Sequence, residues 1–219
     1  MDIGYLFGIK AGDVVFSASD IGYLCSQAHP HLLPTNLFLG WVSGHTFIVY
    51  SPLLARATTV LFEGKPVGTP SAGTFWRIIS DYRVNILHTA PTALRAIRRE
   101  DPSGDAFFKN YNLRCLRGLF LGGERSEPGI VEFYQKLLTQ YCAPDARVVD
   151  HWGSTEGGSP MTGIALGLEG RKIPLKPGSA GKPMPGWDIK VVDNDGKGAA
   201  ATATQYTSIA NFIARDGAG

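Results

Sequence analysis

The feature that most constrains the fold is a repeated alternation of short apolar runs with longer segments whose apolar residues share one helical face. The apolar runs, each typical of a buried strand, lie within residues 9–20, 58–62, 85–89, 116–121 and 148–149. The helical patterns lie within residues 41–54, 75–82, 91–97 and 126–141. Strands that alternate with helices predict an α/β fold in which helices flank a parallel sheet on both faces.

Composition argues against several classes of protein. The 219 residues carry 21 basic and 19 acidic side chains in mixed order, and no basic block indicates nucleic-acid binding. No apolar run reaches the length of a membrane span. The cysteines, Cys25, Cys115 and Cys142, lie far apart and outside any metal-binding spacing. We therefore expect a globular protein with reduced thiols in an intracellular compartment, cytoplasmic or mitochondrial.

The stretch 147–162, RVVDHWGSTEGGSPMT, has the composition of a ligand-binding loop. An apolar pair leads into a polar tripeptide and a glycine-rich turn, which is typical of a strand that delivers polar groups beyond its carboxyl end. Gly153 and Gly157 let a ligand approach the backbone closely. Thr155 offers a hydroxyl group, and Glu156 offers a hard oxygen ligand suited to Mg²⁺. We interpret the stretch as a nucleotide-site loop.

Two further loops follow predicted strands, at residues 89–92 and 122–125. Because parallel strands end at one edge of a sheet, we expect all three loops to meet at one pocket. Each loop also has a purely structural explanation: Thr92 as a helix cap, Glu124 with Arg125 as a surface ion pair, and the third loop as a polar turn. The sequence has no Walker A motif and no dinucleotide fingerprint, and it lacks the last glycine of a hydrolase nucleophile elbow.

Several blocks occur along the chain in one order: SGHTFIVYSPLL, ATTVLFEGKPVGTP, TAPTALRAIRRED, GLFLGGER, VVDHW with STE and GSPMTG, and PGSAGKPMPGWDIKVVD. Together they resemble the AMP-forming acyl-CoA synthetases of the short-chain group, which includes acetyl- and propionyl-CoA synthetases. The resemblance covers most of residues 9–197 apart from 23–40. It implies part of the large N-terminal domain of the adenylate-forming fold. It also implies a reaction in which ATP and a carboxylate give an acyl-adenylate and pyrophosphate, after which CoA displaces AMP.

The resemblance further implies roles for residues of the expected pocket. It matches Gly123, Glu124 and Arg125 to the adenine-side loop, and Asp150, His151 and Trp152 to the strand end beneath the adenine and acyl group. It matches Ala90, Thr92, Trp152 and Gly153 to the acyl pocket. Thr155 corresponds to the residue that contacts the phosphate, and Glu156 to the Mg²⁺-associated carboxylate. Thr155 and Glu156 are then the expected catalytic residues. ATP or AMP, Mg²⁺, CoA and a small carboxylic acid are the expected ligands, and Mg²⁺ needs few protein carboxylates because the phosphates supply other oxygens.

One departure from the family pattern concerns the acid. Acetate-using relatives usually have a second tryptophan where this chain has Gly153. Without that indole, several methylene groups gain room, and each buried methylene contributes about 0.8 kcal/mol. We therefore expect a longer or branched acyl group to be preferred over acetate.

We expect three parts along the chain. Residues 1–162 form an incomplete α/β subdomain with an atypical insertion at 23–40, residues 163–197 form a loop- and β-rich section with half a hairpin at 188–196, and residues 198–219 form a poorly packed tail. The sequence indicates no oligomeric state.

The family's phosphate loop, its ribose-binding aspartate, its hinge and its small C-terminal domain with the adenylation lysine are not found among the 219 residues. We therefore expect a central fragment that makes no acyl-CoA by itself, because phosphate charge is poorly neutralised and domain rotation is impossible. The alternative is a non-catalytic nucleotide- or acyl-binding protein, or a regulatory protein, derived from the same fold. A peptide-synthetase adenylation domain is disfavoured by the GKPVGTP and DHW blocks.

Overall fold

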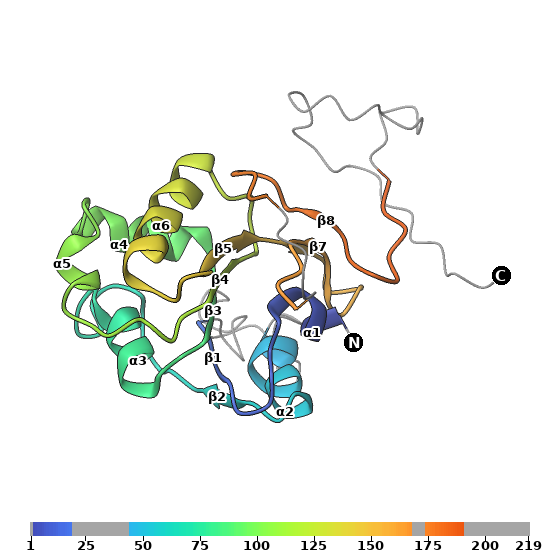
Figure 1. Cartoon of the computed structure of the whole chain (residues 1–219), viewed down its shortest axis with the longest axis horizontal. Coiled ribbons are helices and arrows are strands. Elements are labelled where there is room, and N and C mark those ends of the chain that lie inside the picture. Colours follow the sequence, from blue (N-terminus) through green and yellow to red (C-terminus); the bar gives the residue numbers. More distant parts are fainter. Residues whose placement is uncertain (1, 19–43, 168–173, 191–219) are drawn as a thin grey trace, which may run out of the picture.

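The computed structural model describes residues 2–18, 44–167 and 174–190, and its centre is a 5-stranded parallel sheet (Figure 1). In spatial order the strands are β2 (Thr58–Val60), β1 (Val14–Ser17), β3 (Ile86–Thr89), β4 (Gly118–Leu121) and β5 (Arg147–Asp150). Every pairing in this sheet is parallel. The predicted α/β class and each predicted strand of this sheet are therefore confirmed. The expected insertion at 23–40 and the expected tail at 198–219 lie outside the described residues.

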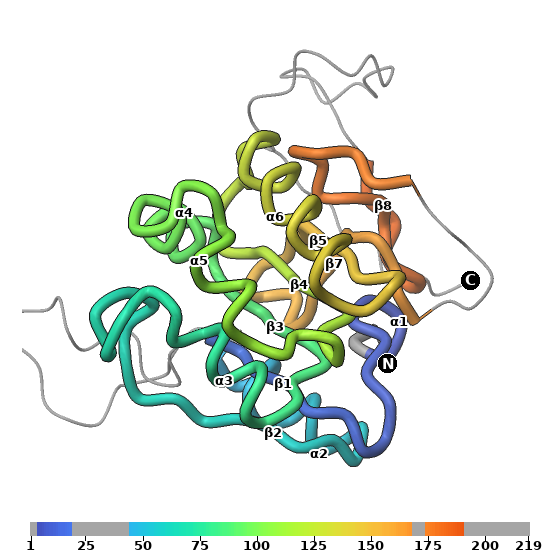
Figure 2. Tube along the Cα trace, turned by 60° about the vertical axis from the view of Figure 1, so that its left-hand side comes forward, coloured from blue at the N-terminus to red at the C-terminus, as the bar shows by residue number. Residues whose placement is uncertain are grey.

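One face of the sheet is covered by four helices (Figures 1 and 2). They are α3 (Thr74–Tyr82), α4 (Pro91–Glu100), α5 (Asp105–Phe108) and α6 (Pro128–Tyr141). Both α4 and α6 begin at a proline, whose missing N–H would have no partner in the first turn of a helix. Their apolar faces pack with Trp76 and Phe108 into one core against the sheet. The helices expected at 75–82, 91–97 and 126–141 are confirmed, whereas α5 is too short to show a helical period in the sequence.

The opposite face is covered by α1 (Asp2–Phe7), the π-helix η2 (Gly44–Tyr50) and α2 (Ser51–Leu54). Here a second core joins Phe7 of α1 and Phe47 of η2 to the sheet. The helix expected at 41–54 is confirmed over residues 44–54, with its proline in the first turn of α2. The helix α1 was not predicted from the sequence.

A small antiparallel sheet follows β5 and consists of β6 (Trp152–Gly153), β7 (Pro160–Gly163) and β8 (Lys182–Pro183). The segment after β7 is joined to α1 by a hydrogen bond from Leu166 N–H to the carbonyl oxygen of Leu6, at 3.0 Å. The strand expected from residue 188 is wrong for residues 188–190, which have no regular structure. Pairing with β7 is taken instead by β8, and Asp188 and Lys190 form an exposed ion pair at 3.3 Å.

The order in which successive strands are added to the sheet reverses at β1, because β2 lies on one side of it and β3 on the other. In open α/β sheets, ligands bind outside the carboxyl ends of the strands near such a point. The loops that follow β3, β4 and β5 are therefore the positions at which a functional site is expected.

Candidate functional site

The three predicted loops begin at directly neighbouring positions of the sheet. Thr89, Leu121 and Asp150, the last residues of β3, β4 and β5, are partners in strand register. The backbone continues this alignment beyond the strands, because Gly122 N–H donates to the Thr89 carbonyl (3.3 Å) and His151 N–H donates to the Leu121 carbonyl (3.0 Å). Loops that are separated in the chain thus start side by side at one edge of the sheet.

Thr92 and Glu124 are brought together from two of these loops. The Thr92 hydroxyl donates a hydrogen bond to Glu124 Oε1, and Arg95 Nη2 lies 2.8 Å from the same oxygen. The Thr92 hydrogen bond and the Arg95 charge hold the pKa of the Glu124 carboxyl below its ordinary value. Neither structural explanation from the sequence holds, because Thr92 makes no cap bond for α4, whose N-cap is Ala90, and Glu124 pairs with Arg95.

Arg95 is a site residue that sequence reasoning missed. It lies three residues after Thr92 on α4, so helical geometry places both side chains on one face. Its guanidinium also lies 3.9 Å from Glu127 Oε1. The signal in the sequence was the (i, i+3) spacing itself.

Asp150 directs its carboxylate into the protein. Only 5% of the residue is exposed, and Asp150 Oδ2 accepts a hydrogen bond from the Ser126 N–H at 3.3 Å. Burial raises the pKa of this carboxyl, although the hydrogen bond from the Ser126 N–H opposes the shift. Because Ser126 directly follows Arg125, Asp150 anchors the end of the loop that contains Gly123, Glu124 and Arg125. Gly123, Glu124 and Arg125 themselves lie exposed at the surface.

His151 points to the opposite face of the sheet from Asp150. Its imidazole lies with His88, Phe7 and Phe47 in a group of four rings whose centroids are all within 6.1 Å of one another. His88 Nδ1 is 3.0 Å from the Ser17 hydroxyl. Burial lowers the pKa of both histidines, to about 4 for His151, so both rings are neutral.

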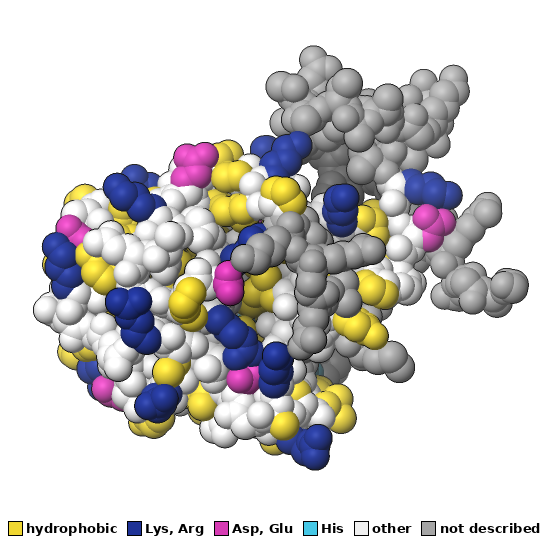
Figure 3. Space-filling model, viewed as in Figure 1, with side chains coloured by type: hydrophobic (Ala, Val, Ile, Leu, Met, Phe, Trp, Pro, Cys, Tyr) yellow, Lys and Arg dark blue, Asp and Glu magenta, His cyan; other side chains and the backbone are white. Residues whose placement is uncertain are grey.

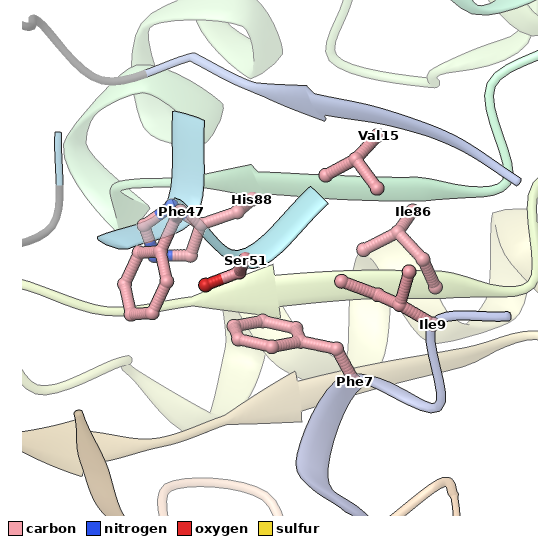
Figure 4. A pocket seen from close by; sticks show the side chains of 7 residues that line it. All are labelled: Phe7, Ile9, Val15, Phe47, Ser51, Ile86 and His88. Carbon is pink, nitrogen blue, oxygen red and sulfur yellow. The ribbon is translucent and has the colours of Figure 1, made fainter. Parts of the chain in front are cut away.

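A small apolar cavity adjoins this ring cluster (Figure 4). It is lined by Phe7, Ile9, Val15, Phe47, Ser51, Ile86 and His88. Sequence reasoning found His151 but missed its ring partners, because they come from α1, η2 and β3, which are distant in the chain. Figure 4 shows Phe7 and Phe47 on either side of the Ser51 hydroxyl.

Thr155 and Glu156 lie at the exposed tip of the loop that joins β6 to β7. The turn is closed by a hydrogen bond from Gly158 N–H to the Thr155 carbonyl at 3.2 Å, and Gly157 N–H donates to Ser154 Oγ at 3.3 Å. Hydrogen bonds from its own backbone N–H and from Ser154 hold the pKa of Glu156 below its ordinary value. Glu156 is therefore an ionised, accessible carboxylate on a hairpin loop.

Trp152 and Gly153 form β6, and the glycine is required there by its close neighbours. A Cβ atom at Gly153 would lie 2.8 Å from the Ser159 carbonyl oxygen and 3.1 Å from Pro160 Cα. The backbone of β7 therefore fills the position that a side chain at residue 153 would take. Trp152 itself is half-buried and pairs with Thr162.

The loops offer a metal ion single carboxylates and not a cluster of ligands, within the described residues. Within the described ranges, no group of three or more His, Cys, Asp or Glu side chains could hold a metal ion. Mg²⁺ is usually bound by one or two carboxylates together with substrate phosphates, and the accessible Glu156 fits that requirement. Several buried polar atoms near the strand ends have no hydrogen-bond partner among the described residues, including Thr89 Oγ1, Ser126 Oγ and both ring nitrogens of His151.

None of the helices in the part of the chain that the structure describes is long and apolar enough to span a bilayer.

Comparison with known sequences gives matches over most of the chain. The family model described as "AMP-binding enzyme" matches residues 13–203. The chain is 42% identical over 190 residues to acyl-CoA synthetase short-chain family member 3, mitochondrial, from Bos taurus, covering 87% of this chain and 24% of that relative. It is 38% identical over 192 residues to acetyl-coenzyme A synthetase from Novosphingobium aromaticivorans, covering 88% and 25%. The chain thus spans about a quarter of the length of these relatives.

Solved structures match the same architecture. An acyl-CoA synthetase from Brucella canis superimposes with a TM-score of 0.68 and 26% identity, over 92% of this chain and 30% of that chain. An anthranilate CoA ligase in complex with anthranoyl-AMP gives a TM-score of 0.66 over 91% of this chain and 31% of that chain. At 22% identity, the latter likeness concerns the fold alone.

Proposed function

Because this chain belongs to the family of AMP-binding enzymes, we propose that its residues form part of the nucleotide- and acyl-binding edge of an AMP-forming acyl-CoA synthetase. The proposed reaction converts ATP, a small carboxylic acid and CoA into acyl-CoA, AMP and pyrophosphate. The curated relatives named as acyl-CoA synthetases support this reaction class. The relatives named as mitochondrial support an intracellular location.

The observation that carries the proposal is the in-register start of three loops at Thr89, Leu121 and Asp150. The residues matched to adenine, acyl group and phosphate by family resemblance come from these loops. A pocket built this way needs no single continuous motif, because the parallel sheet aligns the strand ends. The Thr92 to Glu124 hydrogen bond, which joins two of the loops, supports one shared site.

In the proposed site, the adenine ring lies on the loop of Gly123, Glu124 and Arg125. Gly123 has φ +92 and no atom within 4 Å of the position its Cβ would take, so an aromatic base can approach this backbone. Asp150 accepts a hydrogen bond from the Ser126 N–H and so holds the end of this loop in position from the interior of the protein. Asp150 acts through the loop, whereas Gly123 and Arg125 are the residues proposed to face the nucleotide.

Phosphate and metal are proposed to meet the β6–β7 loop. The Thr155 hydroxyl donates a hydrogen bond to a phosphate oxygen, and the ionised Glu156 carboxylate is the protein ligand of Mg²⁺. When bound, Mg²⁺ supplies positive charge that stabilises the charge developing on the phosphates during displacement. The exposure of both side chains at the loop tip supports these roles, because each is accessible to a ligand.

The acyl group is proposed to lie near Ala90, Thr92, Trp152 and Gly153. The preference for a longer acid rests on the missing indole at Gly153. A Cβ atom at Gly153 would lie 2.8 Å from the Ser159 carbonyl oxygen, so the Ser159 backbone has to shift before an acyl chain can use this space. CoA then attacks the acyl-adenylate carbonyl with its thiol, and AMP leaves.

We further propose that the 219 residues do not complete this cycle by themselves, since they span 24% of the Bos taurus relative. The second candidate is a non-catalytic protein that binds a nucleotide or acyl group through the same loops.

A chimera separates the two candidates. Residues 13–190 replace the matching quarter of the Novosphingobium acetyl-coenzyme A synthetase, and acyl-CoA formation is measured with acetate, butyrate and hexanoate. Turnover supports the synthetase, and a higher rate with butyrate or hexanoate supports the longer acid. A folded chimera that binds AMP without turnover supports the binding protein. The unmodified chain, incubated with ATP and acid, should yield no acyl-AMP by mass spectrometry.

A further inference from the structure

The loop that carries Thr155 and Glu156 is joined to the π-helix η2 by a hydrogen bond. Thr46 Oγ1 donates to the Gly158 carbonyl oxygen at 3.1 Å, although the two residues are 112 positions apart in the chain. Gly158 also closes the turn, since its own N–H donates to the Thr155 carbonyl at 3.2 Å. Thr46 therefore holds the same residue that sets the shape of the turn around Thr155 and Glu156.

The sequence of this loop gives it conformational freedom. Residues 153–159, GSTEGGS, contain three glycines, and Gly158 has φ +69, which glycine adopts at little cost. The hydrogen bond from Gly157 N–H to Ser154 Oγ, at 3.3 Å, joins residues of the loop only to one another. The bond from Thr46 comes from outside the hairpin, so it restrains the direction of the turn relative to the sheet.

Thr46 is itself fixed to the core of the protein. The Ser51 hydroxyl donates a hydrogen bond to the Thr46 carbonyl oxygen. The next residue, Phe47, is buried, and its ring centroid lies 4.5 Å from that of His88 and 5.8 Å from that of His151 (Figure 4). His88 belongs to β3 and His151 directly follows β5, so η2 packs against two of the strands that lead into the predicted loops. Thr46 therefore connects the β6–β7 loop to the central sheet.

The position of single donors matters here because the surface charge is mixed. Basic and acidic side chains are interspersed over the face of the molecule drawn in Figure 3, and the described residues of that face form no large basic patch. The whole chain carries 21 basic and 19 acidic residues. Hydrogen bonds weaken steeply with distance and angle. A small rotation of the turn should therefore be enough to impair phosphate binding by a single hydroxyl and a single carboxylate.

We propose that Thr46 is a positioning residue of the nucleotide site, which directs the Thr155 hydroxyl and the Glu156 carboxylate toward the phosphates and Mg²⁺. This inference rests on the proposed function, because that function gives Thr155 and Glu156 their ligands. Thr46 acts through Gly158. Loss of its hydroxyl should weaken phosphate binding and leave adenine binding unchanged, because the adenine-side loop is held separately from α4 and from β5.

Hydrogen exchange of the full chain, followed by mass spectrometry of its peptides, tests the link without a ligand. Thr46→Val keeps the shape of the side chain and removes the donor, so the amides of residues 155–159 should exchange about three- to tenfold faster. Thr46→Ser keeps the hydroxyl and should exchange like the unmodified chain. The matched control, Thr139→Val, removes an exposed hydroxyl hydrogen bond within α6 and should leave this loop unchanged. Equal exchange in Thr46→Val and the unmodified chain would overturn the proposal.

Calorimetric titrations with two ligands test whether the link positions the phosphate-binding groups. MgATP carries the phosphates and the metal ion, whereas adenosine presents only the base and the ribose. Thr46→Val should bind MgATP about three- to tenfold more weakly and adenosine equally well, and Thr46→Ser should bind both like the unmodified chain. An equal loss for both ligands would mean a general disturbance of the fold and would contradict a positioning role.

The unmodified chain separates a failure of this inference from a failure of the proposed function. An unmodified chain that binds no MgATP contradicts the proposed function, and the assignment of Thr46 to a nucleotide site falls with it. Binding by the unmodified chain, together with the same MgATP affinity in Thr46→Val, contradicts the role of Thr46 alone.

Discussion

The imidazole rings of His88 and His151 stack with their centroids 5.3 Å apart and their planes inclined by 28°. Burial lowers the pKa of both rings, and the neighbouring His151 lowers that of His88 further. Phe7 and Phe47 surround the pair and offer no counter-charge. The fold therefore accommodates this pair only when both rings are neutral.

Acid should destabilise the fold through these two histidines. In the unfolded chain a histidine titrates near 6.5, whereas His151 in the folded chain titrates at about 4. Between these values the unfolded state binds protons that the folded state does not, so the free energy of unfolding falls as pH falls. We expect His151 alone to cause a loss of about 2 kcal/mol at about pH 5 relative to about pH 7.5, and His88 to add to this loss in the same direction. Urea unfolding at both pH values measures this loss.

His88→Phe provides the control, because it keeps a ring in the cluster and removes one titrating group. The loss of unfolding free energy on acidification should then be smaller than in the unmodified chain. Asp150 acts in the opposite direction, since burial raises its pKa and its stability contribution falls as pH rises. Asp150→Asn should therefore increase the loss of unfolding free energy on acidification. An unchanged pH dependence in His88→Phe would show that other groups cause it.

Gly122 is required at its position by the ring of His151. A Cβ atom at Gly122 would lie 2.7 Å from His151 Cε1 and 2.9 Å from His151 Nε2. We expect Gly122→Ala to lower the free energy of unfolding by about 1–3 kcal/mol, because the ring is held between other rings and cannot move away. Thermal or urea unfolding measures the change.

Gly129→Ala is the matched control, because no atom lies within 4 Å of its Cβ position on α6. This substitution should leave stability unchanged or raise it by up to about 1 kcal/mol, because alanine favours the helix. Equal destabilisation in the two variants would show that the contact with His151 is not the cause.

Much of the sheet could be predicted because its strands carry their own signals. The runs that became β3, β4 and β5 are apolar, bounded by turn residues and alternate with periodic helices, so local pattern and tertiary structure agree. The β6–β7 hairpin was not predicted, because the Gly- and Ser-rich stretch at 153–159 was interpreted as a ligand loop alone. Strands as short as β6 and β8, which have 2 residues each, show no alternation in the sequence.

The candidate site also has a part that could be predicted from the sequence and a part that could not. The convergence of Thr89, Leu121 and Asp150 follows from parallel topology and could be inferred from the order of elements. The pairing of Glu124 with Arg95 could not be inferred from the sequence, because a loop and a neighbouring helix can meet through many combinations of side chains. The inward direction of Asp150 also required the structure, since it depends on the N–H of Ser126.

Cys142 is expected to be chemically inert in the folded chain. Only 1% of it is exposed, and burial raises the pKa of its thiol to about 12. Because the thiolate is the reactive species, an aromatic disulfide reagent should modify Cys142 only after unfolding. Mass spectrometry of tryptic peptides, labelled with and without urea, locates the modification. Labelling of Cys142 in the folded chain at the rate of the partly exposed Cys115 would contradict this expectation.

The hydrogen bond between Thr92 and Glu124 should matter more for ligand binding than for stability. Both residues are exposed, so Thr92→Val should change the free energy of unfolding by less than about 1 kcal/mol. The substitution keeps the shape of the side chain but removes the donor that fixes Glu124 relative to α4. If the adenine-side loop binds AMP as proposed, its mobility should increase and the AMP affinity should fall about three- to tenfold.

Calorimetric titration with AMP compares Thr92→Val with the control Thr139→Val. Thr139 also donates one exposed hydroxyl hydrogen bond, to the Gln135 carbonyl at 2.8 Å, but it lies on α6 away from the strand ends. The control should lose no affinity, because its hydrogen bond closes only a turn of its own helix. Equal affinities in both variants and in the unmodified chain would show that the link from α4 to Glu124 does not position the nucleotide loop.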